Sequence, residues 1–107
     1  MTESTNMKEP DTAEPANTAI EAAVFRRLIA HLDGRKDVQN IELMNLAGFC
    51  RNCLSRWYEE EADQLQQPVD RETARERIYG MPYSEWKAKF QQPATAEQLA
   101  AMAAAKQ

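Results

Sequence analysis

The stretch HLDGRKDVQNIELMNLAGFCRNCLSRWY, residues 31–58, decides how this chain folds. Its apolar side chains recur every three or four residues, which is the pattern of an amphipathic helix. Asp37 is suited to cap the start of this helix. Gly48 is its weak point, because a glycine within a helix costs roughly 1 kcal/mol relative to alanine. We therefore predict one long helix that begins after Asp37 and ends at about Gln66.

Helices are also predicted on both sides of this stretch, because capping residues and apolar periodicity occur there together. A helix capped at Asn17 or Thr18 is expected to end at Gly34. The remaining helices are expected over residues 71–79, 84–90 and from 96 onward. With three glycines and five prolines, the 107 residues offer few turns for a β protein. The sequence therefore predicts an all-α fold, a small multihelical domain.

The two ends of the chain differ from its middle in composition. Residues 1–16 are rich in polar side chains and prolines, and they carry four acidic residues against one lysine. Such a segment buries too little apolar surface to offset the entropy of ordering, so we predict a disordered acidic tail. Residues 17–92 are expected to form the helical domain. Residues 93–107 are expected to be an alanine-rich C-terminal helix or a frayed tail.

Net charge and hydropathy exclude several kinds of partner. The formal net charge is −4, so the chain lacks the basic excess that nucleic-acid binding normally requires. It contains neither a secretory signal pattern nor an apolar run of about 18 residues. We therefore expect a cytoplasmic protein that binds neither nucleic acid nor membrane. No motif in the sequence indicates a cofactor, and enzymatic activity stays undecided.

Cys50 and Cys53 form a CxxC pair within the predicted long helix. On a continuous helix both thiols lie in the apolar stripe together with Trp57. Arg51 then lies at the edge of the stripe and Asn52 on the opposite side. Buried cysteine packs as a small hydrophobe, so core packing is the first interpretation. A redox pair is the alternative if the helix restarts at the glycine before the pair, which would place the thiols at a helix start.

A metal site is disfavoured, because the CxxC pair supplies only two of about four ligands. His31, the single histidine, is expected roughly 15 Å from Cys50 along the helices, too far for shared coordination within one subunit. We predict no metal. His31 instead stands near Arg35, Asp37 and Asn40, a polar group able to hold an anion, or it interacts with the end of its own helix.

The stretch quoted above and a second one, RIYGMPYSEWKAKFQ, together resemble the SMc04008-like family of short, mainly proteobacterial proteins, a domain of unknown function. The resemblance covers about residues 19–92. It implies a compact multihelical fold and an intertwined or otherwise close homodimer, and it implies no activity. The candidate site residues in the matching part are His31, Asp37, Asn40, Cys50, Arg51, Asn52, Cys53 and Trp57.

Two functions follow from these observations. The first is a small cytosolic helical homodimer that acts as a binding or interaction module, with a protein partner in addition to its own second copy. Amphipathic helices in a chain of this size often complete their burial in an oligomer. The alternative is a thiol- or metal-dependent enzyme or sensor that uses Cys50 and Cys53.

Overall fold

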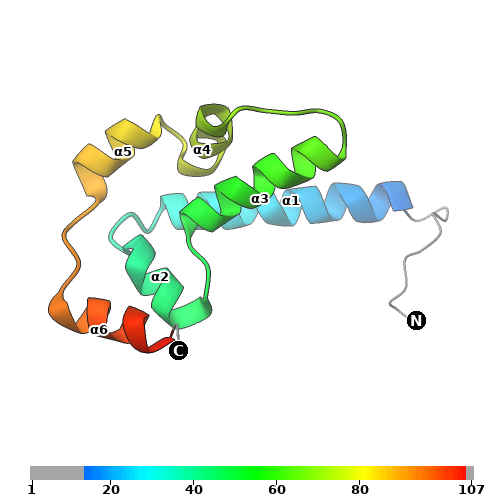
Figure 1. Ribbon diagram of the computed structural model, residues 1–107. Coiled ribbons are helices and arrows are strands. Elements are labelled where there is room, and N and C mark those ends of the chain that lie inside the picture. Colours follow the sequence, from blue (N-terminus) through cyan, green and yellow to red (C-terminus); the bar gives the residue numbers. More distant parts are fainter. Residues whose placement is uncertain (1–13, 106–107) are drawn as a thin grey trace, which may run out of the picture. The chain divides into compact units, whose positions relative to one another are not determined.

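The computed structural model describes residues 14–105, and the regular structure in that part is entirely α-helical (Figure 1). The helices are α1 (Glu14–Asp33), α2 (Asn40–Ala47), α3 (Arg51–Gln64), α4 (Arg71–Tyr79), α5 (Tyr83–Phe90) and α6 (Ala96–Ala105). The predicted all-α fold is confirmed. Residues 1–13 of the predicted acidic tail lie outside the described residues, as do residues 106–107 at the other end.

The chain divides into two compact units, with the boundary between His31 and Leu32. The first unit consists of most of α1, a helix of 20 residues. This helix begins at Glu14, earlier than the expected capping position. Thr18 donates its hydroxyl hydrogen to the carbonyl oxygen of Glu14 at 2.9 Å, as a residue within a helix does. The helix ends directly before Gly34, as predicted.

The single long helix predicted from Asp37 to about Gln66 is wrong, because the structure has two helices there, α2 and α3. Gly48 ends α2 in the left-handed region with φ of 79°, and its N–H bonds to the carbonyl of Met44 at 2.9 Å. Glycine adopts this conformation without the steric cost of a Cβ atom. Cys50 is then extended, with φ of −147°, before α3 begins.

The helix expected over residues 71–79 and the helix start expected at residue 96 are confirmed, while α5 begins at Tyr83, one residue before the expected start. Asp70 accepts a hydrogen bond from the N–H of Thr73 at 2.7 Å, and Gly80 ends α4 with φ of 76°. Thr95 and Gln98 form a reciprocal capping box at the start of α6, with N···O distances of 2.8 and 3.0 Å. These boundaries were predictable because each depends on residues close together in the sequence.

The start of α2 differs from the prediction, because Gln39 and not Asp37 precedes the helix. The backbone N–H of Gln39 donates to the Glu42 carboxylate at 2.7 Å in a capping box. The side-chain amide of Gln39 also donates, through its Nε2 group, to the carbonyl oxygen of Phe90 at 3.0 Å. This polar side chain therefore ties the start of α2 to the end of α5.

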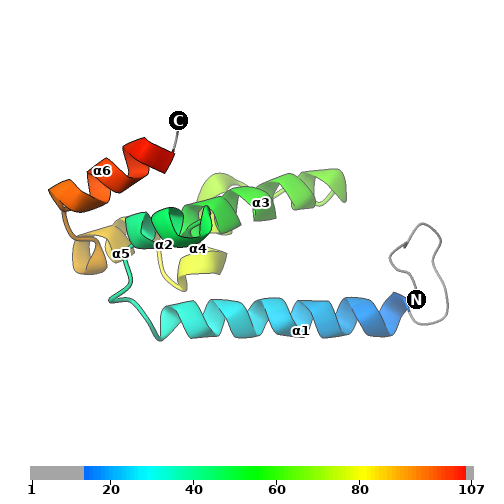
Figure 2. The same cartoon turned by 90° about the horizontal axis from the view of Figure 1, so that it is seen from below.

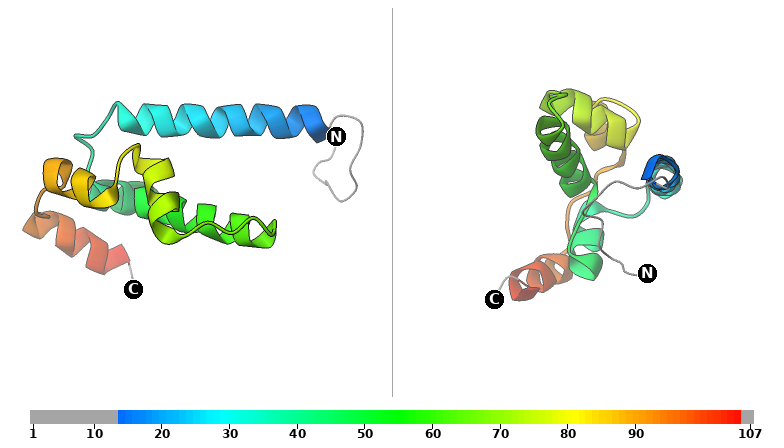
Figure 3. Two further views of the ribbon diagram at one scale, coloured as in Figure 1. Left: turned by 90° about the horizontal axis from the view of Figure 1, so that it is seen from above. Right: turned by 90° about the vertical axis from the view of Figure 1, so that its right-hand side faces the viewer.

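The helices of the second unit pack mainly in two pairs. α4 packs against α3 and α6 packs against α2, while α5 follows α4 and contacts it (Figures 2 and 3). The buried apolar side chains of this unit are Leu32, Cys50, Leu54, Ala74, Ile78, Tyr79 and Trp86. Leu54, Ala74, Ile78, Tyr79 and Trp86 come from α3, α4 and α5. The rings of Tyr79 and Trp86 meet edge to face with their centroids 4.9 Å apart.

Trp57, which was expected in the apolar stripe, is instead 43% exposed, and Leu46 in the same stretch of sequence is 86% exposed. The stripe was derived for one continuous helix. The break at Gly48 removes the fixed rotation of 100° per residue on which that derivation depends. Neither α1 nor any other helix within residues 14–105 combines the length and the apolar character of a membrane span.

Candidate functional site

The side chain of Arg51 is the centre of a polar network at the start of α3, and Arg51 is only 2% exposed. Its guanidinium donates to the carbonyl oxygens of Val38 at 2.8 Å, Arg35 at 2.9 Å and Leu32 at 3.4 Å. It also donates to the Oδ1 atom of Asn40 at 3.0 Å. Arg51 therefore fixes the loop between α1 and α2 against the first turn of α3.

Aromatic packing covers the other side of the same guanidinium. The Cζ atom of Arg51 lies 5.0 Å from the ring centroid of Trp86, which is 1% exposed. This is a cation–π contact out of water, where such contacts are strongest. Burial lowers the pKa of Arg51, but an arginine side chain keeps its charge in proteins. The guanidinium of Arg51 therefore places a permanent positive charge in the interior at the start of α3.

The network continues from Asn40 through the hydroxyl of Tyr79 to Asn52. The Nδ2 group of Asn40 donates to the Tyr79 oxygen at 3.1 Å, and the Tyr79 hydroxyl donates to Oδ1 of Asn52 at 2.6 Å. Burial raises the pKa of Tyr79, which keeps the hydroxyl protonated and able to donate. The expectation that Asn52 faces solvent is wrong, because this hydrogen bond holds it half-buried against α4.

The two thiols lie at the beginning of the same helix. Cys50 is the residue directly before α3 and is buried, whereas Cys53 is in the first turn and half-buried. Burial is the main cause that raises the pKa of the Cys50 thiol, and the neighbouring Cys53 adds a smaller effect in the same direction. The backbone N–H groups of Cys53 and Asn52 act in the opposite direction. The helix restart that the sequence left open as an alternative is therefore observed.

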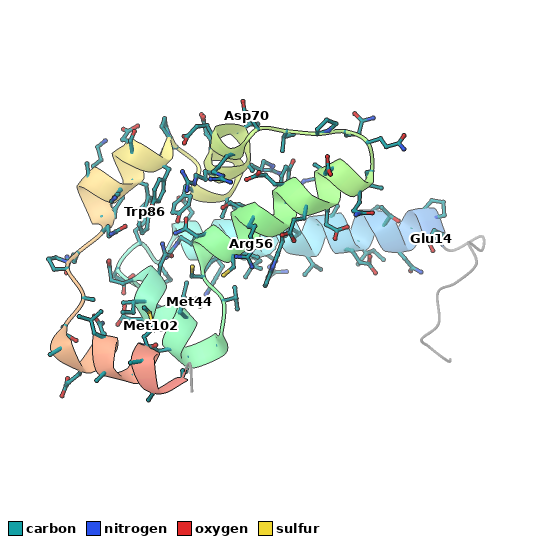
Figure 4. The ribbon with its side chains drawn as sticks, in the orientation of Figure 1. Glu14, Met44, Arg56, Asp70, Trp86 and Met102 are labelled. Atoms are coloured by element: carbon teal, nitrogen blue, oxygen red, sulfur yellow. The ribbon has the colours of Figure 1, made fainter. Side chains whose placement is uncertain are left out.

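A third sulfur atom lies beside this pair. The Sγ atom of Cys53 is 3.8 Å from the Sδ atom of Met44, near the end of α2. Met44, Cys50 and Cys53 together are called the sulfur cluster below. Figure 4 labels Met44 on α2 and Trp86 on α5, the helices that supply partners to the first turn of α3. Sequence reasoning missed Met44, because its approach depends on how the chain turns at Gly48.

The other candidate residues lie at the surface. Trp57 stacks on Phe49 with ring centroids 6.1 Å apart and is partly exposed. Asp37 pairs with Arg35 at 3.1 Å, and this hydrogen bond lowers the pKa of the Asp37 carboxyl. His31 is exposed and belongs to the first unit, whereas the other candidates belong to the second. An anion site that includes His31 stays a prediction.

The arrangement limits which metal chemistry is feasible. Within residues 14–105, no group of three or more His, Cys, Asp or Glu side chains gathers to hold a metal ion. The donor atoms that do gather at the start of α3 are two thiols and one thioether. Any ligand of this site is therefore one that sulfur binds well.

Fold and site together define a small all-α protein with a dithiol at a helix N-terminus, directly beside a buried arginine. A family model described as "Protein of unknown function (DUF1244)" matches residues 38–104. The match covers more than half of the 107 residues and includes the sulfur cluster, and the chain belongs to this family. No curated protein gives a significant match to the sequence. The family carries no established activity, so any function must be argued from the site.

Proposed function

We propose that the protein is a dithiol binding or sensor protein that uses Cys50 and Cys53. The observation that carries this proposal is the restart of α3 at Arg51, which brings both thiols to one turn at a helix start. Backbone N–H groups at such a position favour negative charge on a ligand or a sulfur atom. The pair is therefore suited to hold a bound species or to become oxidised.

The identity of the residue before α3 supports a chemical role. Helix starts favour Ser, Thr, Asp or Asn at this position, because their oxygen atoms accept hydrogen bonds from the first turn. Cys50 stands there instead, and its side chain makes no capping hydrogen bond. A serine would serve the helix better than a cysteine does. Capping therefore gives no reason for a thiol at this position, so the reason is either its burial in the core or ligand binding and redox chemistry.

A thiol–disulfide oxidoreductase is disfavoured by the same geometry. Such an enzyme needs an accessible thiolate of low pKa as its nucleophile. In this protein Cys50 is 6% exposed, and burial raises the pKa of its thiol. Cys53 is more accessible, and within residues 14–105 its thiol contacts the Met44 sulfur atom and no basic side chain. The site is therefore better suited to binding or sensing than to rapid exchange.

Mild oxidation of the native protein tests the proposal. In the expected reaction two thiols form one disulfide, and two protons and two electrons pass to an oxidant such as diamide. The intact mass should fall by two hydrogen atoms, and a reductant should restore it. Cys50→Ser is the control and should show no such loss. If the thiols of the wild-type chain resist both diamide and soft metal ions, the proposal is wrong.

A homodimer that serves as a binding module is the second proposal, and a property of α1 supports it. Ile20 and Val24 lie one turn apart and are 60% and 61% exposed. Glu14 and Glu21 lie in the N-terminal half of the helix, while Arg26 and Arg27 follow Val24. Two α1 helices that pair antiparallel would bury the apolar side chains and place opposite charges together, as a two-fold interface allows.

Light scattering at micromolar concentration tests the dimer. The wild-type chain is expected at twice the monomer mass, and the double variant Ile20→Glu/Val24→Glu is expected at the monomer mass. The double variant Ala19→Glu/Ala23→Glu adds the same charge to the same helix and should remain a dimer. A wild-type monomer would refute the proposal, as would a dimer that survives both double variants.

The finer family assignment and the location of the protein are also proposals. The two stretches quoted from the sequence support membership in the bacterial SMc04008-like group. Both cysteines are free thiols. Free thiols are typical of the reducing cytoplasm, where we place the protein. Fractionation of the native cell would test this, and recovery of the chain outside the cytoplasm would contradict it.

A further inference from the structure

We propose that the sulfur cluster is a site for the cuprous ion, Cu(I), with the thiolates of Cys50 and Cys53 and the thioether of Met44 as ligands. This inference rests on the proposed dithiol function and names the class of ligand. It adds a residue from a different helix, Met44 of α2, to the pair on α3.

The distance between two of the sulfur atoms fits a shared metal ion. Cys53 Sγ and Met44 Sδ lie 3.8 Å apart. Two sulfur atoms at about 2.3 Å from one metal ion are about 3.8 to 4.0 Å apart when the coordination is tetrahedral or trigonal. Cys50 directly precedes α3 and Cys53 lies in its first turn, so the two cysteines are separated by about one helical turn. One ion would therefore reach Cys53 and Met44 without moving either helix, and Cys50 by a side-chain adjustment.

The chemistry of the donor atoms favours Cu(I) over zinc. Thioethers are soft ligands that bind Cu(I) and contribute little to zinc sites, which use thiolate, imidazole or carboxylate. Within the described part of the chain, no His, Asp or Glu joins the two cysteines to complete a zinc site. Three sulfur atoms without a fourth donor suit an ion that accepts low coordination numbers. Cu(I) is that ion among the metals common in cells.

The burial of the sulfur cluster and its place at the start of α3 suit a bound Cu(I) ion. Cys50 is buried, while Cys53 and Met44 are half-buried, so an ion would be shielded yet within reach of a partner that delivers or removes it. Binding replaces two S–H hydrogens, which leave as two protons, and the complex of two thiolates with Cu(I) carries one negative charge. The N-terminus of α3 favours that negative charge.

The experiment is an anaerobic titration of the full chain with Cu(I) in competition with a chromogenic chelator. We expect one Cu(I) per chain. Met44→Leu should weaken binding about tenfold, by analogy with the loss of a supporting group at other metal sites. Cys53→Ser should abolish binding. Met81→Leu makes the same substitution between α4 and α5 and should bind as the wild type does. Circular dichroism confirms that each variant folds.

The titration and the oxidation test together separate the Cu(I) inference from the dithiol proposal on which it rests. Equal affinity of wild type and Met44→Leu would remove the thioether from the site and overturn this inference. Absence of Cu(I) binding by a wild-type chain that still forms its disulfide reversibly would also overturn it, while the dithiol proposal would stand. A chain that neither binds Cu(I) nor forms the disulfide would overturn both.

Discussion

The tetrapeptide Cys50–Cys53 contains two kinds of residue, and the comparison between them explains the site. The inner pair, Arg51 and Asn52, is held by strong hydrogen bonds, with guanidinium contacts of 2.8 to 3.0 Å to three acceptors and a contact of 2.6 Å from Tyr79 to Asn52. The outer pair, Cys50 and Cys53, has weak partners, among them a sulfur atom at 3.8 Å. The inner pair therefore fixes the backbone, and the outer pair presents its thiols.

The same four residues therefore serve two purposes, because the inner pair stabilises the fold and the outer pair is available for chemistry. Buried polar groups that lose a partner cost about 1 to 3 kcal/mol each, so the inner side chains are expensive to replace. Thiols form only weak hydrogen bonds, so replacing one breaks no strong polar contact. Substitutions along four consecutive residues should therefore have very different effects on the free energy of unfolding.

The largest expected effect is that of Arg51→Met. Methionine fills part of the volume but leaves the carbonyl oxygens of Val38, Arg35 and Leu32 without their donor. Urea unfolding should show a loss of about 3 kcal/mol or more. Arg56→Met is the matched control, because its side chain on the same helix is 60% exposed, and it should change stability by no more than about 0.5 kcal/mol. Equal losses for both variants would refute the role of Arg51.

Tyr79→Phe should have the next largest effect. The variant keeps the ring contact with Trp86 but removes the hydroxyl that joins Asn40 to Asn52. Two half-buried amides lose a partner, and we expect a loss of about 1 to 3 kcal/mol in urea unfolding. Tyr83→Phe, at a half-buried tyrosine near the start of α5, serves as the comparison. A Tyr79→Phe variant as stable as Tyr83→Phe would show that the polar bridge adds nothing.

Gly48→Ala should have a smaller effect on stability. A Cβ atom at this position meets no other atom within 4 Å, so the cost comes only from the left-handed φ of 79°. We expect a loss of about 1 to 2 kcal/mol in urea unfolding, and less for Gly48→Asn, because asparagine tolerates this region better. If Gly48→Ala gains stability, the helix continues through this position and the restart of α3 is wrong.

The dependence of stability on pH should show the smallest effect. The pKa values of the Cys50 thiol and the Tyr79 hydroxyl are both raised by burial. The folded chain therefore holds these protons more firmly than the unfolded chain does, and stability should fall as pH rises above about 8.5, the ordinary pKa of cysteine. Cys50→Ser should remove the first part of this fall in urea unfolding at pH 8 to 10. An unchanged profile in Cys50→Ser would contradict the assignment to Cys50.

Local signals predicted most of the fold but not the site. The caps at Asp70, Gly80 and Thr95 are read from residues adjacent in the sequence, and the structure has them. The break at Gly48 was identified as a weak point, but apolar periodicity on both sides favoured a continuous helix. Local patterns do not reveal that Arg51 finds carbonyl acceptors in a distant loop, and those acceptors stabilise the broken form.

The partners within the site depend on contacts between distant residues. Asn40 and Tyr79 are 39 residues apart, and no periodicity predicts their hydrogen bond. The approach of Met44 to Cys53 likewise follows from the turn between α2 and α3. The sequence identified Cys50 and Cys53 as candidates through their spacing alone. It could not assign the inner pair to the fold and the outer pair to chemistry.

The stability of Cys50→Ser tests the central claim most directly, because the claim is that Cys50 is present for its thiol and not for the fold. Serine is a better residue than cysteine before a helix, so urea unfolding should show a free energy of unfolding that is unchanged or higher by up to about 1 kcal/mol. A loss of about 2 kcal/mol or more would contradict the account and make Cys50 a packing residue of the core.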